Sequence, residues 1–437
     1  MEDHASVTAT DPNLAINEIA ERFFEGVLER EPIFATILGD DRFDDRLPDL
    51  GATGRAEEAR VYRALLAEVE PIDPERLAPE QVITRDMLIL VARNNLEAQD
   101  ARLYQLAINH ISGVQTMPVM VAQYQIAETP AGLEKLLNRF AAFPTAIQQY
   151  IDTLREGITD GRTSSAIPVR KQVEQIERLI ATPTSEFPAV TLAHVADDEA
   201  RARVAKAVDE HIKPALQTLR DFLADEYEPH AMPEPGISAT PNGQDAYRLA
   251  IRMQTTVATT AEEVHAFGLE DLSRIEAEMD TIAHRLGHAD RHALKAALQT
   301  DPTNHTDSRD AIVELAEQQS ERAYAAAPTY FCRLPSANCV VKPVEEYRER
   351  ETPPAFYAAL AGWLASRPVL HQHVSARGAA APQDRGNHLP RGDAWPPFPD
   401  RDRDGARWPA PLPHAGRPDG GRGLRRRLGP VLRTPGR

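Results

Sequence analysis

The residues best placed for metal chemistry are His371 and His373, which flank Gln372 in the last fifth of the 437-residue chain. A hydrolytic zinc ion is held by about three protein ligands, which are oriented by further hydrogen bonds. A carboxylate beside the first histidine can serve as the base, yet the chain contains no His-Glu dipeptide. We therefore expect at most a weak chelate at these histidines, and we predict neither a metal site nor a catalytic residue in this chain.

Other residue types that carry chemistry also lack the required spacing. Six residues separate Cys332 from Cys339, which fits neither a redox pair nor a zinc knuckle and predicts buried, reduced thiols. The acidic residues between Asp40 and Asp45 lack the alternating spacing of a calcium loop and predict a solvated turn. The chain has no nucleophile elbow, phosphate loop or dinucleotide fingerprint, which argues against serine hydrolases, kinases and dehydrogenases.

The charge of the chain limits the kinds of partner that it can bind. The formal net charge is −17, so most of the surface repels nucleic acid and anionic membranes. Residues 1–10 contain no apolar core of a signal peptide, and nowhere do about 18 apolar residues run together. These features predict a cytoplasmic protein that binds neither nucleic acid nor membranes.

The elements that would position a site are mainly helical. Apolar residues recur at three- and four-residue steps from Ile16 to Leu28, from Val169 to Ile180 and from about Ala311 to Ala327. A further helix begins at Thr260, where Glu263 completes a capping box, and it ends at Gly287. The apolar stripe of that helix, which needs a partner, consists of Val264, Phe267, Leu272, Ile275, Met279, Ile282 and Leu286. The best strand candidate is Asn338 to Val344, so any sheet is small.

Composition divides the chain into three parts. Residues 1–15 are predicted to be flexible, 16–357 to form a helical domain, and 358–437 to be a disordered tail rich in Arg, Pro and Gly. The tail holds 14 Arg and 6 Asp but no Lys or Glu, so its net charge is +8 while that of residues 1–357 is −25. One interpretation is a basic arm that contacts acidic partners through residues such as Arg425, Arg426 and Arg427. The total loss of Lys instead favours a GC-rich gene translated in a wrong frame.

Several motifs in residues 18–357 together resemble a bacterial family catalogued as domain of unknown function 885. They follow one another in the order expected for that family. The motifs are Glu31-Pro32, Ala35 to Gly39, Asp45 to Leu50, Leu154 to Gly157 with Gly161, Pro241-Asn242-Gly243 with Tyr247, Thr260 to His265 with Gly268-Leu269, and Leu334-Pro335 with Val341, Pro343 and Val344.

The resemblance implies a helical, zincin-like metallohydrolase that acts on small peptide-like substrates and binds zinc through a His-Glu-x-x-Pro-Gly-His-His motif. In this chain that motif is absent, and Pro390 to Gly392 and Pro396 to Phe398 stand in its place. Read one nucleotide later, however, the codons permitted for 362–373 can spell Ala-Gly-Ser-Arg-Pro-Gly-Pro-Tyr-Phe-Ile-Asn-Thr. At the same offset, 388–399 can spell Thr-Phe-His-Glu-Ala-Thr-Pro-Gly-His-His-Phe, and 423–437 can spell Ala-Tyr-Val-Glu-Gly-Trp-Gly-Leu-Tyr-Ser-Glu-Arg-Leu-Ala. Three family segments at one offset predict a single-base shift near Ala358 to Gly362.

In an intact member of the family, Tyr247 and His265 would be candidates for the substrate cleft. Tyr247 could steady a substrate carbonyl, although a tyrosine near a turn more often packs. His265 could face the cleft, although beside a capping box it can equally be half exposed to solvent.

Two hypotheses follow for the function. The first is an inactive product of a zinc-dependent hydrolase lineage, with an incomplete zincin-like fold. The second is a helical interaction or scaffold protein with a basic tail. Under the first, the front helices lack core to bury against, which predicts marginal stability and exposed apolar surface.

Overall fold

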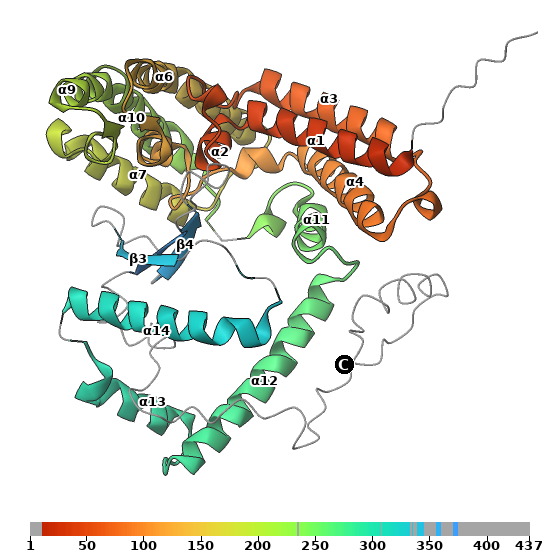
Figure 1. Ribbon diagram of the computed structural model, residues 1–437, viewed down its shortest axis with the longest axis vertical. Helices are drawn as coiled ribbons and strands as arrows, with labels where there is room; N and C mark the ends of the chain where they lie inside the picture. Colours follow the sequence, from red (N-terminus) through yellow and green to blue (C-terminus); the bar gives the residue numbers. More distant parts are fainter. Residues whose placement is uncertain are drawn as a thin grey trace, which may run out of the picture. The chain divides into compact units, whose positions relative to one another are not determined.

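The computed structural model describes residues 11–233, 236–306, 308–332, 334, 339–344, 355–359 and 370–374, with the backbone alone for 356–359 and 370–374. This part of the chain is mainly helical, as predicted (Figure 1). The α-helices are α1 (Pro12–Arg30), α2 (Pro32–Ile37), α3 (Ala52–Val69), α4 (Pro79–Asp100), α5 (Met117–Tyr124), α6 (Pro130–Thr159), α7 (Ala166–Ala181), α8 (Pro188–Thr191), α9 (Asp198–Ala207), α10 (Lys213–Asp221), α11 (Gly243–Thr255), α12 (Ala261–Arg285), α13 (Arg291–Thr300) and α14 (Arg309–Tyr330). Among them, none has the length and hydropathy that a membrane span requires.

The helices predicted from periodicity are confirmed as α1, α7, α12 and α14. The boundary predicted for the flexible N-terminus, 1–15, is too late, because α1 begins at Pro12. The Asp11 side chain caps this helix by accepting a hydrogen bond from the Asn13 N–H, and Pro12 suits the first helical position. The capping box of α12 is present with both of its hydrogen bonds.

Strands are short. Strand β1 (Ile126–Ala127) pairs in parallel with β2 (His194–Val195), and β5 (Leu370–Val374) lies between β3 (Cys339–Pro343) and β4 (Ala355–Ala359). The predicted strand near Asn338 to Val344 is therefore confirmed as β3. In the tail predicted to be disordered, 358–359 and 370–374 are strand residues, because backbone pairing needs no particular side chains. The rest of that tail, including Arg425 to Arg427, lies outside the described residues.

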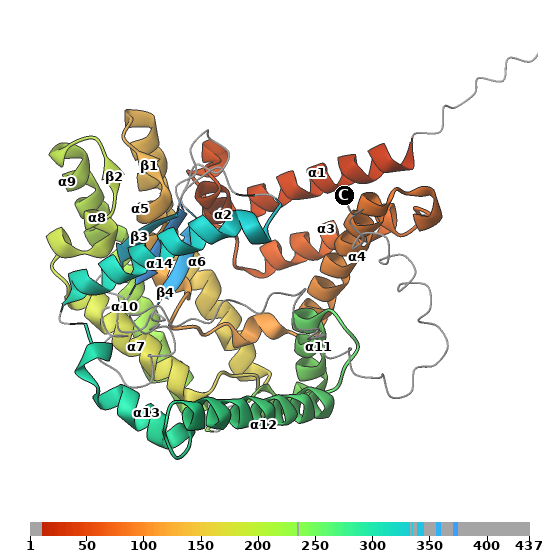
Figure 2. The ribbon, with the colours of Figure 1, turned by 60° about the horizontal axis from the view of Figure 1, so that its bottom comes forward.

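The first helices form a small core of their own. Helices α1, α3 and α4 pack together (Figure 2) and bury Ile16, Tyr62, Leu65, Val69 and Leu88. A larger core surrounds α6, whose buried face includes Phe140, Phe143, Ile147 and Ile151. Helices α5, α7, α9 and α10 contribute to this larger core, as do two π-helical turns, η6 (Val208–Ile212) and η7 (Phe222–Tyr227).

A buried arginine connects α6 to the segment that follows α1. The Arg139 side chain has no exposed surface, yet its guanidinium donates hydrogen bonds to the carbonyl oxygens of Pro32 (2.9 Å), Phe43 (3.0 Å) and Arg46 (2.7 Å). It also donates to Thr36 Oγ1 (2.8 Å) and Gln125 Oε1 (3.0 Å). The guanidinium thus supplies donors to two carbonyl oxygens of the turn around residues 38–46, those of Phe43 and Arg46, and to the first residue of α2.

Asp44 completes this buried cluster. Its carboxylate lies 3.6 Å from the Arg139 guanidinium and 2.5 Å from the Thr36 hydroxyl. Burial lowers the pKa of Arg139 to about 10, and burial also raises the pKa of Asp44, although Thr36 and Arg139 oppose that rise. The prediction of a solvated acidic turn is therefore wrong for Asp44, which is 5% exposed. In the sequence, Arg139 is marked only as a charged residue within an apolar helix face, and nothing local relates it to this turn about 95 positions earlier.

The predicted exposed apolar surface is present on α12. The side chains of Phe267, Leu272 and Leu286 are 60%, 51% and 59% exposed. The periodicity correctly predicts the helix but not a partner for its stripe.

Replacing Arg139 with methionine should destabilise the fold strongly. The change leaves the buried Asp44 carboxylate without its cation and removes the guanidinium donors from the Pro32, Phe43 and Arg46 carbonyl oxygens, a loss that typically costs about 3–5 kcal/mol. Urea unfolding followed by circular dichroism measures the effect. Arg42→Met is the matched control, because Arg42 pairs with Asp40 and Glu25 at the surface of the same turn and should change the unfolding midpoint little. Equal midpoints for the two variants would contradict the role assigned to Arg139.

Candidate functional site

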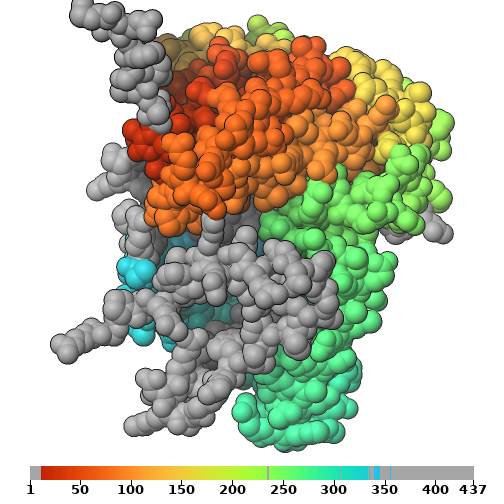
Figure 3. All heavy atoms as spheres, turned by 90° about the vertical axis from the view of Figure 1, so that its right-hand side faces the viewer, coloured from red at the N-terminus to blue at the C-terminus, as the bar shows by residue number. Residues whose placement is uncertain are grey.

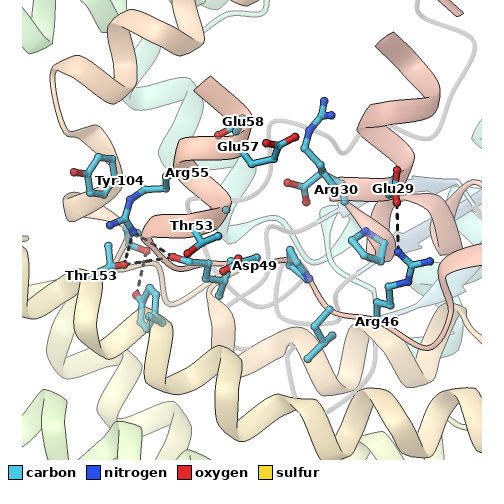
Figure 4. Close-up of a pocket in the computed structure, with 18 residues that line it drawn as sticks. Glu29, Arg30, Arg46, Asp49, Thr53, Arg55, Glu57, Glu58, Tyr104 and Thr153 are labelled. Carbon is cyan, nitrogen blue, oxygen red and sulfur yellow. Dashed lines mark hydrogen bonds and ion pairs between the residues drawn. The ribbon is translucent and has the colours of Figure 1, made fainter. Parts of the chain in front are cut away.

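The described chain contains a pocket of about 510 Å³ between the end of α1, the loop before α3, and α6 (Figure 4). Its volume lies in the range that holds small molecules. Its lining residues are Glu29, Arg30, Glu31, Pro32, Arg46, Leu47, Pro48, Asp49, Leu50, Thr53, Gly54, Arg55, Glu57, Glu58, Tyr104, Ala107, Tyr150 and Thr153. Two of the motifs identified in the sequence, Glu31-Pro32 and Asp45 to Leu50, thus contribute to its wall.

One corner of the pocket is held rigidly by Arg55. Its guanidinium donates to Thr153 Oγ1 at 2.7 Å and to both carboxylate oxygens of Glu156, at 3.1 and 3.0 Å. It also lies 4.3 Å from the centre of the Tyr104 ring, a cation–π distance (Figure 4). With its charge paired and its face stacked, Arg55 positions the wall and is not available as a free anion ligand.

The opposite side of the pocket carries two carboxylates of different character. Glu58 is oriented by the Tyr62 hydroxyl (3.2 Å) and the Gln99 amide (2.9 Å), which donate to its two oxygens. Desolvation in the concave wall raises the pKa of Glu31, and the negative charge of Glu58 raises it further. Desolvation, followed by the Glu58 charge, also raises the pKa of the Tyr62 hydroxyl. Among the carboxyl groups that line this pocket, Glu31 is thus the one whose ionised form the fold disfavours.

The residues of this pocket suit binding better than catalysis. Of the 18 lining residues none is His, Cys, Ser or Lys, so the groups available for chemistry are carboxylates and the hydroxyls of Thr and Tyr. Its carboxylates could hold a compact cation.

The two predicted cleft residues lie elsewhere, and neither lines the pocket. Tyr247 projects from α11 with 46% of its surface exposed, so it is also not packed as the alternative interpretation expects. His265 is exposed in the first turns of α12. Beside it, the Thr260 N–H and the Thr259 hydroxyl hold the pKa of Glu263 below its usual value, as a capping interaction should. A role of Tyr247 and His265 in substrate binding stays a prediction.

The described residues do not fit a metal site. Among them, no three His, Cys, Asp or Glu side chains gather closely enough to hold a metal ion. His371 and His373 lie in β5, where only the backbone is described, and Pro390 to Gly392 and Pro396 to Phe398 lie outside the described residues. Cys332 is exposed and Cys339 half-buried, so the prediction that both thiols are buried is wrong. Cys332 follows the end of α14, and Cys339 begins the edge strand β3.

Several motif residues have architectural roles in the structure. A side chain at Gly243 would place its Cβ 2.0 Å from the Ile237 carbonyl oxygen, so only glycine allows the approach that starts α11. Gly161 has a φ of +68° directly after α6, which is a helix-terminating conformation. Thr36 and Arg46 hydrogen-bond with Arg139. Arg139 is the important residue that the sequence analysis missed, and its position in the apolar face of α6 was the available signal.

Comparisons with known proteins identify relatives by family and by fold. The family described as "Bacterial protein of unknown function (DUF885)" matches residues 32–369. The crystal structure of a "putative lipoprotein" from Colwellia psychrerythraea has a TM-score of 0.74 at 16% identity, over 85% of this chain and 69% of that chain. A second structure, of a "putative lipoprotein of unknown function" from Shewanella oneidensis, has a TM-score of 0.50 at 14% identity, over 76% of this chain and 61% of that chain. No protein with a curated description matches the chain.

Replacing Glu31 with glutamine should stabilise the protein at neutral pH. Because the pKa of Glu31 is raised in the folded state, stability falls as the pH rises from its ordinary value of 4.5 through the raised value. The variant avoids this loss, so its stability relative to the parent should be greater at pH 7 than at pH 4, measured by thermal unfolding.

Glu57→Gln provides a control of opposite sign in the same pocket. Arg60 lowers the pKa of Glu57, so its contribution is present above pH 4.5 and lost as the pH falls. This variant should be the less stable one at pH 7. If both variants shift in the same direction, the assignment of Glu31 is wrong.

Proposed function

The chain belongs to the bacterial DUF885 family of proteins of unknown function, and we propose that its gene lineage encodes a zinc-dependent hydrolase of small peptide-like substrates whose metal-binding segment this product has lost. Three observations support the proposal, namely the family membership, the codons permitted for the tail and the length of the solved relatives. The proposed hydrolase activity belongs to the gene lineage, and the proposed loss of the metal-binding segment concerns this chain.

The observation that carries the proposal is where the family match ends. The match stops at residue 369, shortly after the Ala358 to Gly362 region in which the sequence predicts a single-base shift. Beyond that region the codons permit three successive family segments at one constant offset, including the His-Glu-x-x-Pro-Gly-His-His type of motif. The solved relative from Colwellia psychrerythraea supports the same interpretation, since 31% of its chain has no counterpart here.

The consequence for chemistry follows from the residues that replace the motif. A hydrolytic zinc ion needs neutral imidazole and carboxylate ligands with an open position for water, and a nearby carboxylate accepts the proton of that water. At the corresponding positions this chain has Pro390 to Gly392 and Pro396 to Phe398. Proline, glycine and phenylalanine have no side-chain donor for zinc, and the arginine between them stays protonated. The product as translated is therefore proposed to be inactive.

One structural feature favours the alternative of an interaction protein. The stripe of α12 is exposed, and large exposed apolar surfaces mark binding sites as well as incomplete folds. Under that alternative the basic tail is selected protein sequence and contacts acidic partners. The two proposals differ in what the gene encodes, so sequencing separates them.

Resequencing genomic DNA across the codons of Tyr357 to Gly362 is the first test. We expect either a corrected base that restores the family frame or a confirmed shift in a gene whose downstream codons still spell the family motif. Correcting the frame by one base gives the frame-restored protein, which should bind about one zinc ion per chain and hydrolyse small peptides. The chain as translated should do neither, measured by metal analysis and a peptide panel.

A variant of the frame-restored protein serves as the control. Changing the Glu of its His-Glu pair to Gln should abolish hydrolysis while zinc stays bound, because that carboxylate acts on water and is not a ligand. A frame-restored protein that binds zinc but cleaves no peptide would redirect the search to other hydrolysable substrates. One that folds and binds no zinc would refute the proposed function.

A further inference from the structure

The apolar stripe of α12 is exposed, whereas the apolar helix faces of the larger core are buried. It comprises Val264, Phe267, Leu272, Ile275, Met279, Ile282 and Leu286. On α6 the corresponding apolar face is covered, and Phe140 and Ile147 are each 1% exposed. On α12, which lies at the surface in Figure 3, Phe267 is 60% exposed and Met279 45% exposed. Two helices with similar amphipathic patterns therefore have opposite environments in one chain.

The contacts that α12 makes lie beside the stripe and do not cover it. Arg291 at the start of α13 donates to Asp280 from both its backbone N–H (2.8 Å) and its guanidinium (2.7 Å), and it pairs with Glu276 at 3.1 Å. Ala283, which is fully buried, lies on the same face. With 3.6 residues per turn, this face is roughly a quarter turn from the centre of the stripe. Helix α13 thus anchors one edge of α12 and leaves its apolar face to solvent.

Such a helix is expected to need a partner. A helix in a globular protein takes most of its stability from packing of its apolar face. Each fully buried large apolar side chain contributes about 1.5–3 kcal/mol. Six of the seven stripe residues are exposed and Ile282 is half-buried, so the uncovered side chains represent a large unrealised stabilisation. The capping box explains where α12 begins, but it does not compensate for an uncovered face of this length.

A second copy of the chain fits this face poorly. Between Ala261 and Arg285 the helix carries seven acidic residues and two arginines. Two such helices placed face to face would bring their acidic flanks together, and like charges across an interface oppose association. The occupant should therefore be a different segment, apolar on one side and without strong acidic flanks.

We propose that the stripe of α12 is the docking face for the polypeptide that the family frame encodes beyond residue 369. This inference rests on the proposed function and names the intramolecular partner of the truncated fold. In that frame the codons of 423–437 permit Tyr, Trp, Tyr and Leu at successive steps of four, three and four residues, which is one face of a helix. The unmatched 31% of the Colwellia psychrerythraea structure is enough chain to supply such a cover.

The test compares identical substitutions in two backgrounds, the chain as translated and the frame-restored protein. Phe267→Gln and Ile275→Gln remove apolar groups from the stripe and keep good helix formers. In the frame-restored protein each should lower Tm by roughly 5 °C or more, because it creates a cavity in a core. In the chain as translated each should leave Tm unchanged and should reduce the fluorescence of a bound hydrophobic dye. Glu278→Gln, an exposed acidic position on α12, is the matched control and should be silent in both backgrounds.

Hydrogen exchange provides a readout that does not depend on activity. Amides of residues 261–285 should exchange at least tenfold more slowly in the frame-restored protein than in the chain as translated, whereas α3 should not change. Equal exchange of α12 in the two proteins would overturn the proposal. An equal fall in Tm in the chain as translated would also overturn it, because the stripe would then already be covered. This second result can be obtained even if the frame-restored protein fails to fold.

The outcomes separate this inference from the proposed function. Protection of α12 without zinc binding supports docking and refutes the metal proposal. Zinc binding without protection of α12 supports the metal proposal and refutes docking. Each of the two proposals can therefore fail without affecting the test of the other.

Discussion

The packing of the first 230 residues depends on one buried cation. Arg139 projects from the apolar face of α6 and donates to the carbonyl oxygens of Pro32, Phe43 and Arg46. The Phe43 and Arg46 carbonyls lie in the segment after α2, whereas Pro32 begins α2 and its oxygen also accepts from the Thr36 hydroxyl. The guanidinium thus connects α2 and the following segment to α6. Asp44 balances the charge at 3.6 Å, and Thr36 and Gln125 complete the cluster. A buried charge is tolerated here because every donor finds an acceptor.

The pocket is a consequence of this arrangement. Once Arg139 fixes the turn through Arg46, the chain from Leu47 to Leu50 must pass over α6 before α3 begins. Gln149 of α6 receives this passage, because its side chain accepts from the Leu50 N–H and donates to Asp49. The carboxylates of α1 and α3 then face each other across the space that remains, and their mutual repulsion contributes to the raised pKa of Glu31. The family motifs in this region therefore determine the local architecture, and that architecture determines the shape of the pocket.

The later helices show how local signals can specify a helix whose apolar face stays exposed in the described part of the chain. Capping, helix propensity and the contact with α13 are sufficient to specify α12, so local structure forms with its N-terminal capping box intact. Burial is a non-local property, and the face that periodicity marks as a core face meets no equivalent surface among the described residues. The sheet of β3, β5 and β4 is similarly small, with five-residue strands. In this chain, local sequence signals therefore form helix α12 although no described tertiary surface covers its apolar face.

Local interactions explain which features the sequence determined by itself. The helices at α1, α7, α12 and α14, the capping box of Thr260 and Glu263, and the family follow from spacing and residue type, because each depends on neighbours within a few positions. The tertiary structure alone decided that Asp44 is buried, that Tyr247 and His265 lie apart from the pocket, and that Glu31 faces Glu58. Each of these depends on which segments meet in space. Arg139 and Asp44 are separated by nearly a hundred residues, and no local pattern records that their side chains meet.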